Sequence, residues 1–552
     1  MTFTPNPTQR EVIASSDPVL LVLGGAGTGK TTTAAATARH HLEAGGQRSA
    51  PTRFTPQDGA APRRVLFLSF SRASVARIIE RSGPLLGSSA GQVDVTTFHA
   101  LAWSMIRRFG SLIDRPDPYL MTEAQAKLFA PDERVLRYPD LVPKALELLS
   151  TPAVQDHLKP RWSMIICDEY QDTDETQFEL INQVRGPGAR LLLLGDPNQC
   201  IYASLPGVVG VGPERLASAL ALPGARQVDL PDASYRDPSG LLPAAAAAIR
   251  RRTFDAPAIA VALASGRLEV RSELAPENEA KAVAGVVREL RDAGDSVAVF
   301  SHHNDALANL SDQLAELGIA HETSGLTESM SAAFDAILAM LEFSQGITPW
   351  KGVQQGLAVF VTSALRGRHV PPLARMLLGK AELPGGLSKR LAELEMALPG
   401  SGLSDALNIA AAAHTSLGLP AKASSWNRAA SQLRPMLARI DRGPGQKTPA
   451  AQLGRLESQL QEQRVGLLTE AYSEHEPDVQ LMGLYQTKGR EADSTVIILR
   501  STDFFGMEKK EPYEEGSRLM YVVFTRARKR SIVLIFGSGL PGLIEPLARL
   551  SP

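Results

Sequence analysis

Short apolar runs alternate with amphipathic stretches in the first part of the chain. The runs have the length and the Val/Leu-rich composition of buried strands, and the stretches between them, such as SRASVARIIERS, have helical spacing. Strands that alternate with helices predict an α/β domain built on a parallel sheet. The predicted strands lie at 18–24, 65–70, 93–98, 161–170 and 189–196.

The same alternation returns nearer the C-terminus and predicts a second α/β lobe. Residues 110–160 interrupt the first set of strands, and residues 341–477, which are mostly helical in pattern, interrupt the second. We therefore expect two parallel-sheet lobes, each carrying a mainly helical insertion. The second set of strands is expected at 268–274, 296–301, 479–485, 494–500 and 531–537.

Length and charge refine this picture. A chain of 552 residues is too long for one ordinary domain, and about three or four are expected. Its 58 basic and 59 acidic residues nearly cancel, so any nucleic acid must be bound by a local basic groove. Residues 44–63, rich in Gly, Pro and Ala, are expected to form a surface loop.

Cysteine use and the apolar runs indicate the compartment. Cys167 and Cys200 are far apart in sequence and form no C-x-x-C pair, which fits a reducing cytoplasm better than a disulfide framework or a zinc site. The N-terminal MTFTPNPTQREV lacks the order of a signal peptide. No apolar run reaches the roughly 18 residues of a membrane span, so we expect no membrane partner.

A complete phosphate-binding pattern follows the first strand. Gly24-x-x-x-x-Gly29-Lys30-Thr31 lies between a predicted strand and a predicted helix, which is the context that makes this pattern a site. Backbone N–H groups would face the phosphates of ATP, Lys30 would contact the β- and γ-phosphates, and Thr31 would hold Mg²⁺. The expected nucleotide contacts are Gly24, Gly27, Gly29, Lys30, Thr31 and Thr32.

Polar side chains follow two other strands of the same predicted sheet. Asp168 and Glu169 end the run SMIICDE; the first can hold Mg²⁺, and the second can orient or deprotonate the attacking water. Gln199 follows the run LLLLGD, whose carboxyl end should face the same crevice. An amide there could sense the γ-phosphate, although a surface glutamine is the equally simple alternative.

The motifs together resemble the superfamily 1A DNA helicases of the UvrD/Rep/PcrA kind. A series in the right order carries the resemblance from residue 4 to about 530, over both predicted lobes. The matching segments are TPNPTQREVI, GAGTGKT, VLFLSFSRASV, VTTFHALAWSMIRRF, IICDEYQDTDETQ, GDPNQCIYA, ASYRDPSGLL, VQLMGLYQTKGREADSTVII and SRLMYVVFTRARKR.

The resemblance implies a division into four parts. The RecA-like lobe 1A, which would carry the ATP site, would be built from two segments of the chain. The RecA-like lobe 2A would be built from two further segments. The insertions fall where the family places its subdomains 1B and 2B, and both are short for the family. The expected parts are 1–109 with 161–238 for 1A, 110–160 for 1B, 239–340 with 478–552 for 2A, and 341–477 for 2B.

The resemblance also implies roles at the ATP cleft. Gln9 would recognise the adenine, Tyr235 would stack on it, and Glu491 would contact the ribose. Arg236 and Arg526 would reach the γ-phosphate from the far side, and Gln199 would be the sensor. Two arginines that arrive only when the lobes close make physical sense, because a guanidinium stabilises the charge that develops on the transferring phosphoryl group.

Single-stranded DNA would cross the top of both lobes, with bases stacked on aromatic side chains. A buried aromatic in the core is the alternative at each such position. The candidates for DNA contact are Phe70, Arg72, Phe98, His99, Tyr202, Tyr485 and Lys488.

The chain departs from the family pattern at the DNA track. Ser204 stands where the family usually has a tryptophan that stacks on a base. The absence of this tryptophan would weaken DNA binding by about 1–3 kcal/mol. Ala73 replaces a usual lysine, and Tyr485 replaces a usual histidine. The residues expected to hydrolyse ATP are thus all present, whereas three positions expected to hold DNA are altered.

Two functions remain open from the sequence. The first is an ATP-driven helicase or translocase that moves 3′ to 5′ on single-stranded DNA or tailed duplex. The second is an ATP-gated DNA sensor or adaptor that acts with a nuclease or repair partner, for example in anti-phage defence. We expect no nuclease domain after Arg526, because few residues follow it, so a partner would have to cut the DNA. A P-loop kinase would not explain the later motifs.

Overall fold

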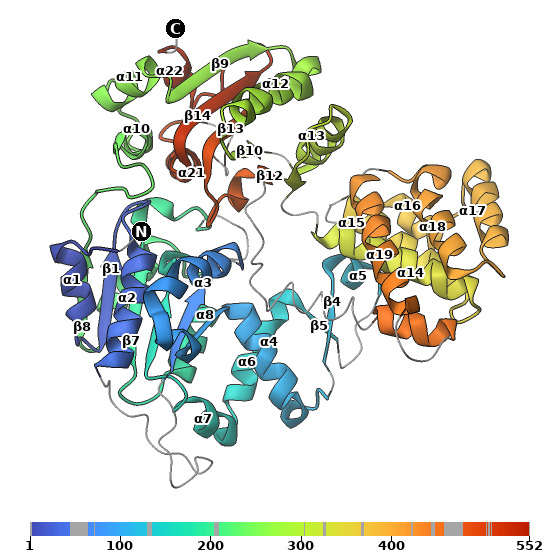
Figure 1. Ribbon diagram of the computed structural model, residues 1–552, viewed down its shortest axis with the longest axis horizontal. Helices are drawn as coiled ribbons and strands as arrows, with labels where there is room; N and C mark the ends of the chain where they lie inside the picture. Colours follow the sequence, from blue (N-terminus) through green and yellow to red (C-terminus); the bar gives the residue numbers. More distant parts are fainter. Residues whose placement is uncertain are drawn as a thin grey trace.

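Two six-stranded parallel β-sheets and a separate cluster of helices form most of the structure (Figure 1). The first sheet with its helices is called lobe 1, the second sheet with its helices lobe 2, and α14–α19 the helical cluster. The computed structural model describes residues 3–44, 64–70, 72–116, 118–129, 135–203, 209–302, 304–323, 327–365, 369–420, 423–442, 448–457, 478–503, 505, 508 and 510–550.

The sheet of lobe 1 has the strand order β3-β2-β6-β7-β1-β8, and all neighbouring strands are parallel. Its central strands are buried along almost their whole length, as expected of continuous apolar runs covered on both faces. The strands are β1 (Val19–Leu23), β2 (Val65–Ser69), β3 (Val93–Thr97), β6 (Met164–Cys167), β7 (Arg190–Gly195) and β8 (Ala225–Asp229).

Helices cover both faces of this sheet. Val12, Ala34 and Ile78 bring α1, α2 and α3 into one core, and Leu101 and Ile181 bring α4 and α8 into the core on the opposite face. The helices are α1 (Pro7–Ala14), α2 (Lys30–Glu43), α3 (Arg72–Leu86), α4 (Phe98–Phe109), α8 (Glu175–Val184) and α9 (Pro213–Leu220), with the 3₁₀ turns η1 (Gly87–Gln92), η4 (Tyr170–Asp172) and η5 (Pro197–Gln199).

Lobe 2 repeats this architecture with the parallel strand order β11-β12-β10-β13-β14-β9. The strands are β9 (Leu268–Leu274), β10 (Val297–Ser301), β11 (Glu322–Thr323), β12 (Val479–Gly483), β13 (Ala492–Arg500) and β14 (Ala527–Phe536). The other elements are α10 (Leu241–Arg250), α11 (Pro257–Ala264), η6 (Pro276–Asn278), α12 (Glu279–Asp292), α13 (Asn304–Glu316), η7 (Leu484–Gln486), α21 (Glu514–Phe524) and α22 (Glu545–Ala548).

The insertion in lobe 1 contains a small sheet as well as helices. Ala124, in α5, belongs to the core of the helical cluster, and its N–H donates to Glu328 Oε1 of that cluster at 3.0 Å. By contrast, α6 packs into the core of lobe 1. The elements are η2 (Gly110–Ile113), β4 (Tyr119–Met121), α5 (Glu123–Leu128), β5 (Val135–Arg137), η3 (Tyr138–Asp140), α6 (Leu141–Leu149) and α7 (Pro152–Leu158), with β4 and β5 paired in parallel.

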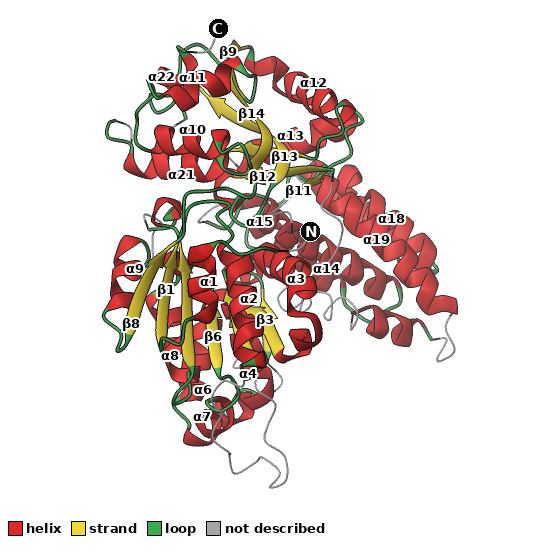
Figure 2. Cartoon of the chain, turned by 60° about the vertical axis from the view of Figure 1, so that its left-hand side comes forward, coloured by secondary structure: helices red, strands yellow, loops and turns green. Residues whose placement is uncertain are grey.

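The helical cluster lies between β11 and β12 in sequence and has its own hydrophobic core. Trp426 is fully buried there, and its Nε1–H donates to the Ala410 carbonyl at 3.0 Å. Figure 2 shows the cluster beside both lobes. Its helices are α14 (Thr327–Ser344), α15 (Trp350–Ala364), α16 (Pro372–Leu377), α17 (Gly385–Ala397), α18 (Leu403–Leu417) and α19 (Ala423–Arg442).

The mixed α/β class with two parallel sheets is confirmed, and each predicted strand has a counterpart. The four strands that were not predicted, β4, β5, β8 and β11, are short or polar: β8 reads ARQVD at a sheet edge. The helical cluster starts at Thr327, ahead of the predicted boundary at 341. Residues 45–63 of the predicted loop lie outside the described residues. Among the helices of the described ranges, none has the length and apolar character needed to cross a membrane.

Candidate nucleotide site between the lobes

The phosphate-binding loop joins β1 to α2. Gly27 and Gly29 have φ of 81° and 85°, a region that glycine adopts without strain, and a Cβ at Gly27 would lie 2.4 Å from Ser234 Oγ. The helix begins at Lys30, whose buried Nζ donates to the carbonyls of Gly24 at 2.7 Å and Gly25 at 3.2 Å. The loop is thus preformed, with its lysine folded over it.

Two acids stand beside this loop where β6 ends. Thr31 Oγ1 donates to Asp168 Oδ2 at 3.2 Å, so both predicted metal ligands lie together. Burial and the neighbouring Glu169 raise the pKa of Asp168 to about 7. Burial acts to raise the pKa of Glu169 too, but Lys488 and Lys30 hold it below its usual value. Glu169 is therefore ionised near neutral pH, whereas Asp168 is protonated in part and would lose its proton when a cation binds.

Glu169 itself has a strained backbone. Its φ of 53° and ψ of 44° lie in the left-handed region, which costs a non-glycine residue roughly 1 kcal/mol or more. Gln171 Nε2 donates to Glu169 Oε2 at 2.5 Å and fixes the carboxylate. Glu169 Oε2 also lies 4.0 Å from Lys488 Nζ of lobe 2, so the carboxylate faces the second lobe.

The predicted adenine contacts gather on the other side of the loop. Gln9 is completely buried, and its Nε2 donates to the Thr28 carbonyl at 3.3 Å. A Cβ at Gly29 would lie 3.0 Å from Gln9 Nε2 and 3.4 Å from Tyr235 Cδ2. The ring of Tyr235 is 56% exposed, so one face is open to a planar ligand. Thr32 lies partly buried in the first turn of α2.

Lobe 2 reaches this site through Arg526, which follows α21. Arg526 Nη2 donates to Gln199 Oε1 at 3.2 Å, and Gln199 Nε2 donates to Asp196 Oδ2 at 2.7 Å. Its Nε donates to the Val522 carbonyl at 2.8 Å. Burial, assisted by Arg236, lowers the pKa of Arg526 to about 9. An additional negative group at this point would be strongly attracted.

Arg236 and Glu491 form a second connection between the lobes. Arg236 Nη2 donates to Glu491 Oε1 at 2.6 Å, and its Nη1 donates to the Thr525 carbonyl at 2.7 Å. Arg236 Nε is buried with no hydrogen-bond partner among the described residues. A buried donor without a partner, beside the phosphate-binding loop, fits a site for an anion.

Four guanidiniums surround the Glu491 carboxylate. Although burial acts to raise its pKa, the guanidinium of Arg236, with those of two arginines of α3, holds the pKa of Glu491 far below its usual range. These arginines lie on lobe 1 and lobe 2, so the carboxylate bridges them. The contacts are Arg236 at 2.6 Å, Arg81 at 2.9 Å, Arg77 at 3.2 Å and Arg528 at 3.3 Å.

Sequence reasoning missed one residue that contacts the loop directly. The Ala26 N–H donates to the Tyr521 hydroxyl at 3.2 Å, and Tyr521 Oη lies 3.5 Å from Asp196 Oδ2. Tyr521 is buried and comes from α21 of lobe 2. The signal was its place in the run Tyr521-Val-Val-Phe-Thr-Arg526, where only the arginine was singled out.

Three predicted DNA-contact aromatics lie close together where the lobes meet. The rings of Phe70 and Tyr202 stack with centroids 5.1 Å apart, and the Tyr202 hydroxyl donates to the Tyr485 carbonyl at 2.9 Å. All three are partly exposed. The side chains of Arg72 and Ala73, and the whole of Ser204, lie outside the described residues.

Three other candidates are placed differently. Phe98 is 2% exposed in the core of lobe 1, so its ring is not accessible to a base in this structure, and its predicted role in DNA contact stays a prediction. Lys488 is 5% exposed and forms an ion pair with Asp172, so its ammonium group faces lobe 1 in this structure, and its predicted role in DNA contact stays a prediction. His99 stacks on Tyr138 with centroids 4.0 Å apart, and burial lowers its pKa to about 4.

The fold and the site define a P-loop nucleotide-binding protein whose cleft is closed by a second α/β lobe. The predicted catalytic residues lie together at this cleft, and their role in ATP hydrolysis stays a prediction; they are Lys30, Asp168, Glu169, Gln199, Arg236 and Arg526. Among the described residues, no group of three or more His, Cys, Asp or Glu is placed to hold a metal ion. Thr31 and Asp168, joined by a hydrogen bond, stay the predicted metal ligands.

Comparison with known proteins agrees with this class. A family model described as an AAA domain matches residues 9–205. DNA helicase II of Escherichia coli is 25% identical over 305 residues, which cover 44% of this chain and 40% of that protein. The helicase Rep of Salmonella typhimurium is 26% identical over 36% of each chain, and PcrA of Bacillus subtilis is 22% identical over 36% of this chain and 33% of its own.

These matches confirm the resemblance to the UvrD-like helicases of superfamily 1. The chain spans 40% or less of the length of these relatives.

Proposed function

We propose that this protein is an ATP-driven motor that moves 3′ to 5′ along single-stranded DNA and separates strands ahead of it. The observation that supports this most is the direct contact between Arg526 of lobe 2 and Gln199 of lobe 1. A site built from both lobes changes whenever they move apart, so binding and hydrolysis of ATP can drive relative motion. The direction is taken from the family resemblance.

The residues at the cleft suit phosphoryl transfer to water. Water attacks the γ-phosphorus, the bond to the β–γ bridging oxygen breaks, and Glu169 accepts the proton that the water loses. When ATP binds, the ammonium group of Lys30 leaves the carbonyls of Gly24 and Gly25 and contacts the phosphates. Arg236 and Arg526 stabilise the negative charge that develops on the transferring group. Gln199 senses the γ-phosphate through the same contact network.

The binding of the rest of the nucleotide follows from the same geometry. Backbone N–H groups of the loop at Gly27 and Gly29 would face the phosphates, whereas the Gly24 N–H donates to the Gly195 carbonyl at 3.1 Å and fixes the start of the loop. Thr32 supports the first turn of α2. Gln9 and Tyr235 hold the adenine, and Glu491 contacts the ribose. Thr31 and Asp168 would hold Mg²⁺, which neutralises phosphate charge when bound.

Coupling to DNA would run through the aromatic group of Phe70, Tyr202 and Tyr485. Lys488 Nζ lies 5.2 Å from the centre of the Tyr202 ring and pairs with Asp172, which follows the metal candidate Asp168 closely in the sequence. A base that displaced Tyr202 would therefore disturb charges beside the ATP site. We propose that the insertion at 110–160 and the helical cluster correspond to the family's subdomains 1B and 2B.

Steady-state ATPase activity with and without single-stranded DNA tests the proposal, with Lys30→Ala as the inactive control. We expect at least tenfold stimulation by DNA and no turnover in the variant. If stimulation is found, duplexes with 3′ or 5′ tails determine the direction. Hydrolysis that ignores DNA would contradict the motor.

One observation favours a second function, an ATP-gated DNA sensor or adaptor that works with a nuclease or repair partner. Phe98 and Lys488 are buried in this structure, so neither side chain is accessible to DNA without a rearrangement. Weak DNA contact suits a switch better than a processive motor. DNA binding that depends on ATP, without unwinding by the protein alone, would support this function.

A further inference from the structure

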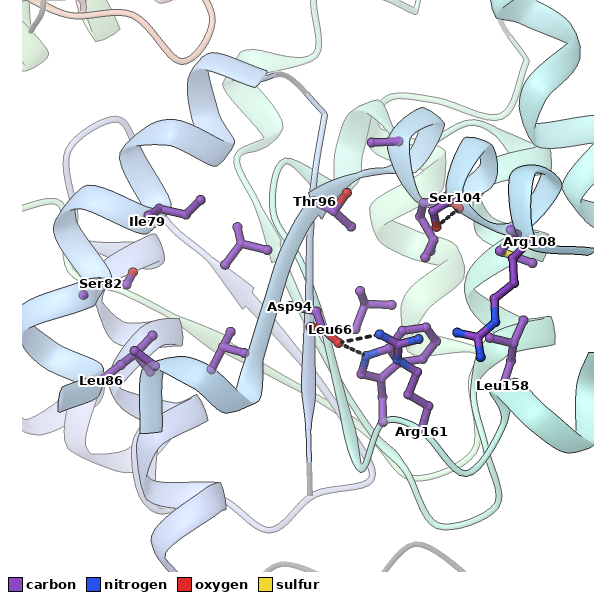
Figure 3. A pocket seen from close by; sticks show the side chains of 18 of the residues that line it. Leu66, Ile79, Ser82, Leu86, Asp94, Thr96, Ser104, Arg108, Leu158 and Arg161 are labelled. Atoms are coloured by element: carbon purple, nitrogen blue, oxygen red, sulfur yellow. Dashed lines mark hydrogen bonds and ion pairs between the residues drawn. The ribbon is translucent and has the colours of Figure 1, made fainter. Parts of the chain in front are cut away.

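An open groove runs along β3, the edge strand of the sheet in lobe 1. It has a volume of about 540 Å³ and is lined by residues of α3, β3, α4 and the segment before β6. Figure 3 shows the groove with β3 between two walls. We call it the edge groove. It shares no lining residue with the candidate nucleotide site.

The backbone of β3 offers hydrogen-bonding groups to this groove. The Leu68 carbonyl accepts a hydrogen bond from the Asp168 N–H, so the backbone groups of Leu68 in β2 point toward β6. Successive residues of a strand point their backbone groups to opposite sides, so those of Phe67 point toward β3. In a parallel ladder, Phe67 bonds to the residues that flank its partner, and that partner is Val95. The N–H and C=O of Val95 therefore point outward, and no strand of the described chain pairs with them.

The two walls of the edge groove differ in chemistry. Ile79 and Leu86 of α3 form an apolar wall, and Ile79 is 46% exposed. Arg108 of α4 and Arg161 form the opposite wall (Figure 3). Their guanidiniums lie over the rings of Phe109 and Trp162, at 5.5 Å and 5.1 Å, which keeps both arginines at the groove.

The arginine wall is positive on balance. Asp94 is the acidic residue of the lining, and its Oδ2 already accepts from Arg64 Nε at 2.9 Å and from Trp162 Nε1 at 2.8 Å. Arg161 Nη2 lies 3.6 Å from the same oxygen, so one carboxylate stands against the two arginines of the wall, Arg108 and Arg161. Burial, with repulsion by Arg108 and Arg161, lowers the pKa of the nearby His157. The unbalanced charge at this wall suits an acidic ligand.

We propose that the edge groove binds an extended acidic segment of a partner protein, which adds to β3 as an outer strand. Side chains of a strand alternate between the two faces of a sheet, so such a segment would place apolar residues against α3 and acidic residues against Arg108 and Arg161. The partner is recognised by this alternation of acidic and apolar residues. The inference does not rest on the motor function, because it concerns an exposed edge away from the ATP cleft.

Binding of a fluorescein-labelled peptide to the full chain tests the proposal by fluorescence anisotropy. The probe alternates aspartate with isoleucine over about ten residues, the upper range for a strand. A peptide of identical composition, with its aspartates in one block and its isoleucines in another, is the control. We expect saturable binding of the alternating peptide and at least tenfold weaker binding of the control.

Matched variants locate the site. Val95→Pro removes the outward N–H, which an edge strand tolerates, and Val95→Ala keeps it. Arg108→Glu reverses the charge of the groove, and Arg107→Glu makes the same change on the exposed residue next to it, outside the lining. We expect Val95→Pro and Arg108→Glu to weaken binding at least tenfold, and both controls to stay within about threefold.

A further variant blocks the groove without changing β3, so the test does not depend on correct folding of Val95→Pro. A Cβ at Gly83 would meet nothing within 4 Å, so Gly83→Trp fills the groove from the α3 wall and should also abolish binding. Equal binding by all variants, or by both peptides, would overturn the proposal. So would a dimer that Val95→Pro dissociates in light scattering, which would make a second copy the occupant. Loss of single-stranded DNA binding in Arg108→Glu, with peptide binding intact, would make the groove a nucleic-acid surface.

Discussion

Arg526 of lobe 2 donates its Nη2 proton to the amide oxygen of Gln199 in lobe 1, across 3.2 Å. Gln199 in turn donates to Asp196, at the end of the strand next to the phosphate-binding loop. Because both side chains are buried, the contact is made in a region where water competes little. The side chain of Gln199 in lobe 1 therefore contacts lobe 2 directly, and this contact changes when lobe 2 moves.

Removal of this guanidinium should abolish turnover. We expect Arg526→Ala to reduce the rate of ATP hydrolysis by about 10³-fold or more, because no other group replaces its charge at the transferring phosphoryl group. Arg530→Ala is the matched control, since Arg530 lies in the same basic run but pairs with Glu269 and Glu289 at the surface. Near-normal DNA-stimulated ATPase in Arg526→Ala would refute the role.

Gln199 and Arg526 should act as a unit. We expect the loss of turnover in Gln199→Ala combined with Arg526→Ala to fall short of the sum of the single losses by about 1 kcal/mol or more, because they share one hydrogen bond. A double-mutant cycle on single-turnover rates measures this coupling. Strict additivity would show that the contact is incidental to hydrolysis.

Glu169 should be needed for chemistry and not for binding. We expect Glu169→Gln to lower the hydrolysis rate by about 10²-fold or more while the affinity for ATP changes little, because the amide cannot accept the proton of the attacking water. Glu179→Gln, on the exposed side of α8, is the control. Binding by a fluorescent ATP analogue separates the two effects. Equal loss of affinity and rate would assign Glu169 a structural role.

Neutralisation of Glu491 should loosen the two lobes. We expect Glu491→Gln to destabilise the protein by about 2–4 kcal/mol, because four guanidiniums would then face one another without a counter-charge. Asp493→Asn is the control, since Asp493 pairs with Arg528 and Lys529 within lobe 2. Small-angle scattering should report a larger radius of gyration for Glu491→Gln alone. Unchanged compactness and stability would contradict the bridging role.

His99 should make the stability depend on pH. Burial lowers its pKa from 6.5 to about 4, so its contribution is complete above pH 6.5 and is lost as the pH falls toward 4. We expect His99→Phe, which can still stack on Tyr138, to reduce the loss of stability between pH 7 and pH 4.5 by about 2 kcal/mol. Urea unfolding at both pH values measures it, with exposed His40→Asn as the control. An identical loss in both proteins would contradict the prediction.

Local chemistry explains which parts of the site could be predicted from sequence. The order of strand, glycine-rich turn and helix around Lys30 is set by neighbouring residues, as are the acids that end β6. Side-chain direction is set by packing instead. Thr97 caps α4 by accepting from the Ala100 N–H at 3.1 Å, which begins the helix at Phe98 and turns that ring into the core.

Contacts between distant segments were beyond sequence reasoning. Lys488 pairs with Asp172, and Tyr521 meets Ala26, because the lobes face each other in space and not in sequence. Nothing in the spacing of QTKGRE or of SRLMYVVFTR marks those partners. The edge groove is likewise a product of strand order, since β3 becomes an edge only when the whole sheet is assembled.

The strand order of lobe 2 also bears on how this architecture can evolve. The chain leaves the sheet after β11 and returns at β12, and these two strands are direct neighbours, with Glu322 beside Gln480 and Thr323 beside Leu481. Departure and return therefore occur at one place on the rim of the sheet. The core of the helical cluster lies outside both large sheets, so the cluster can change in length without altering the strand order of lobe 2. Ala124 of α5 also belongs to this core, so any such change has to keep the contact with the insertion of lobe 1.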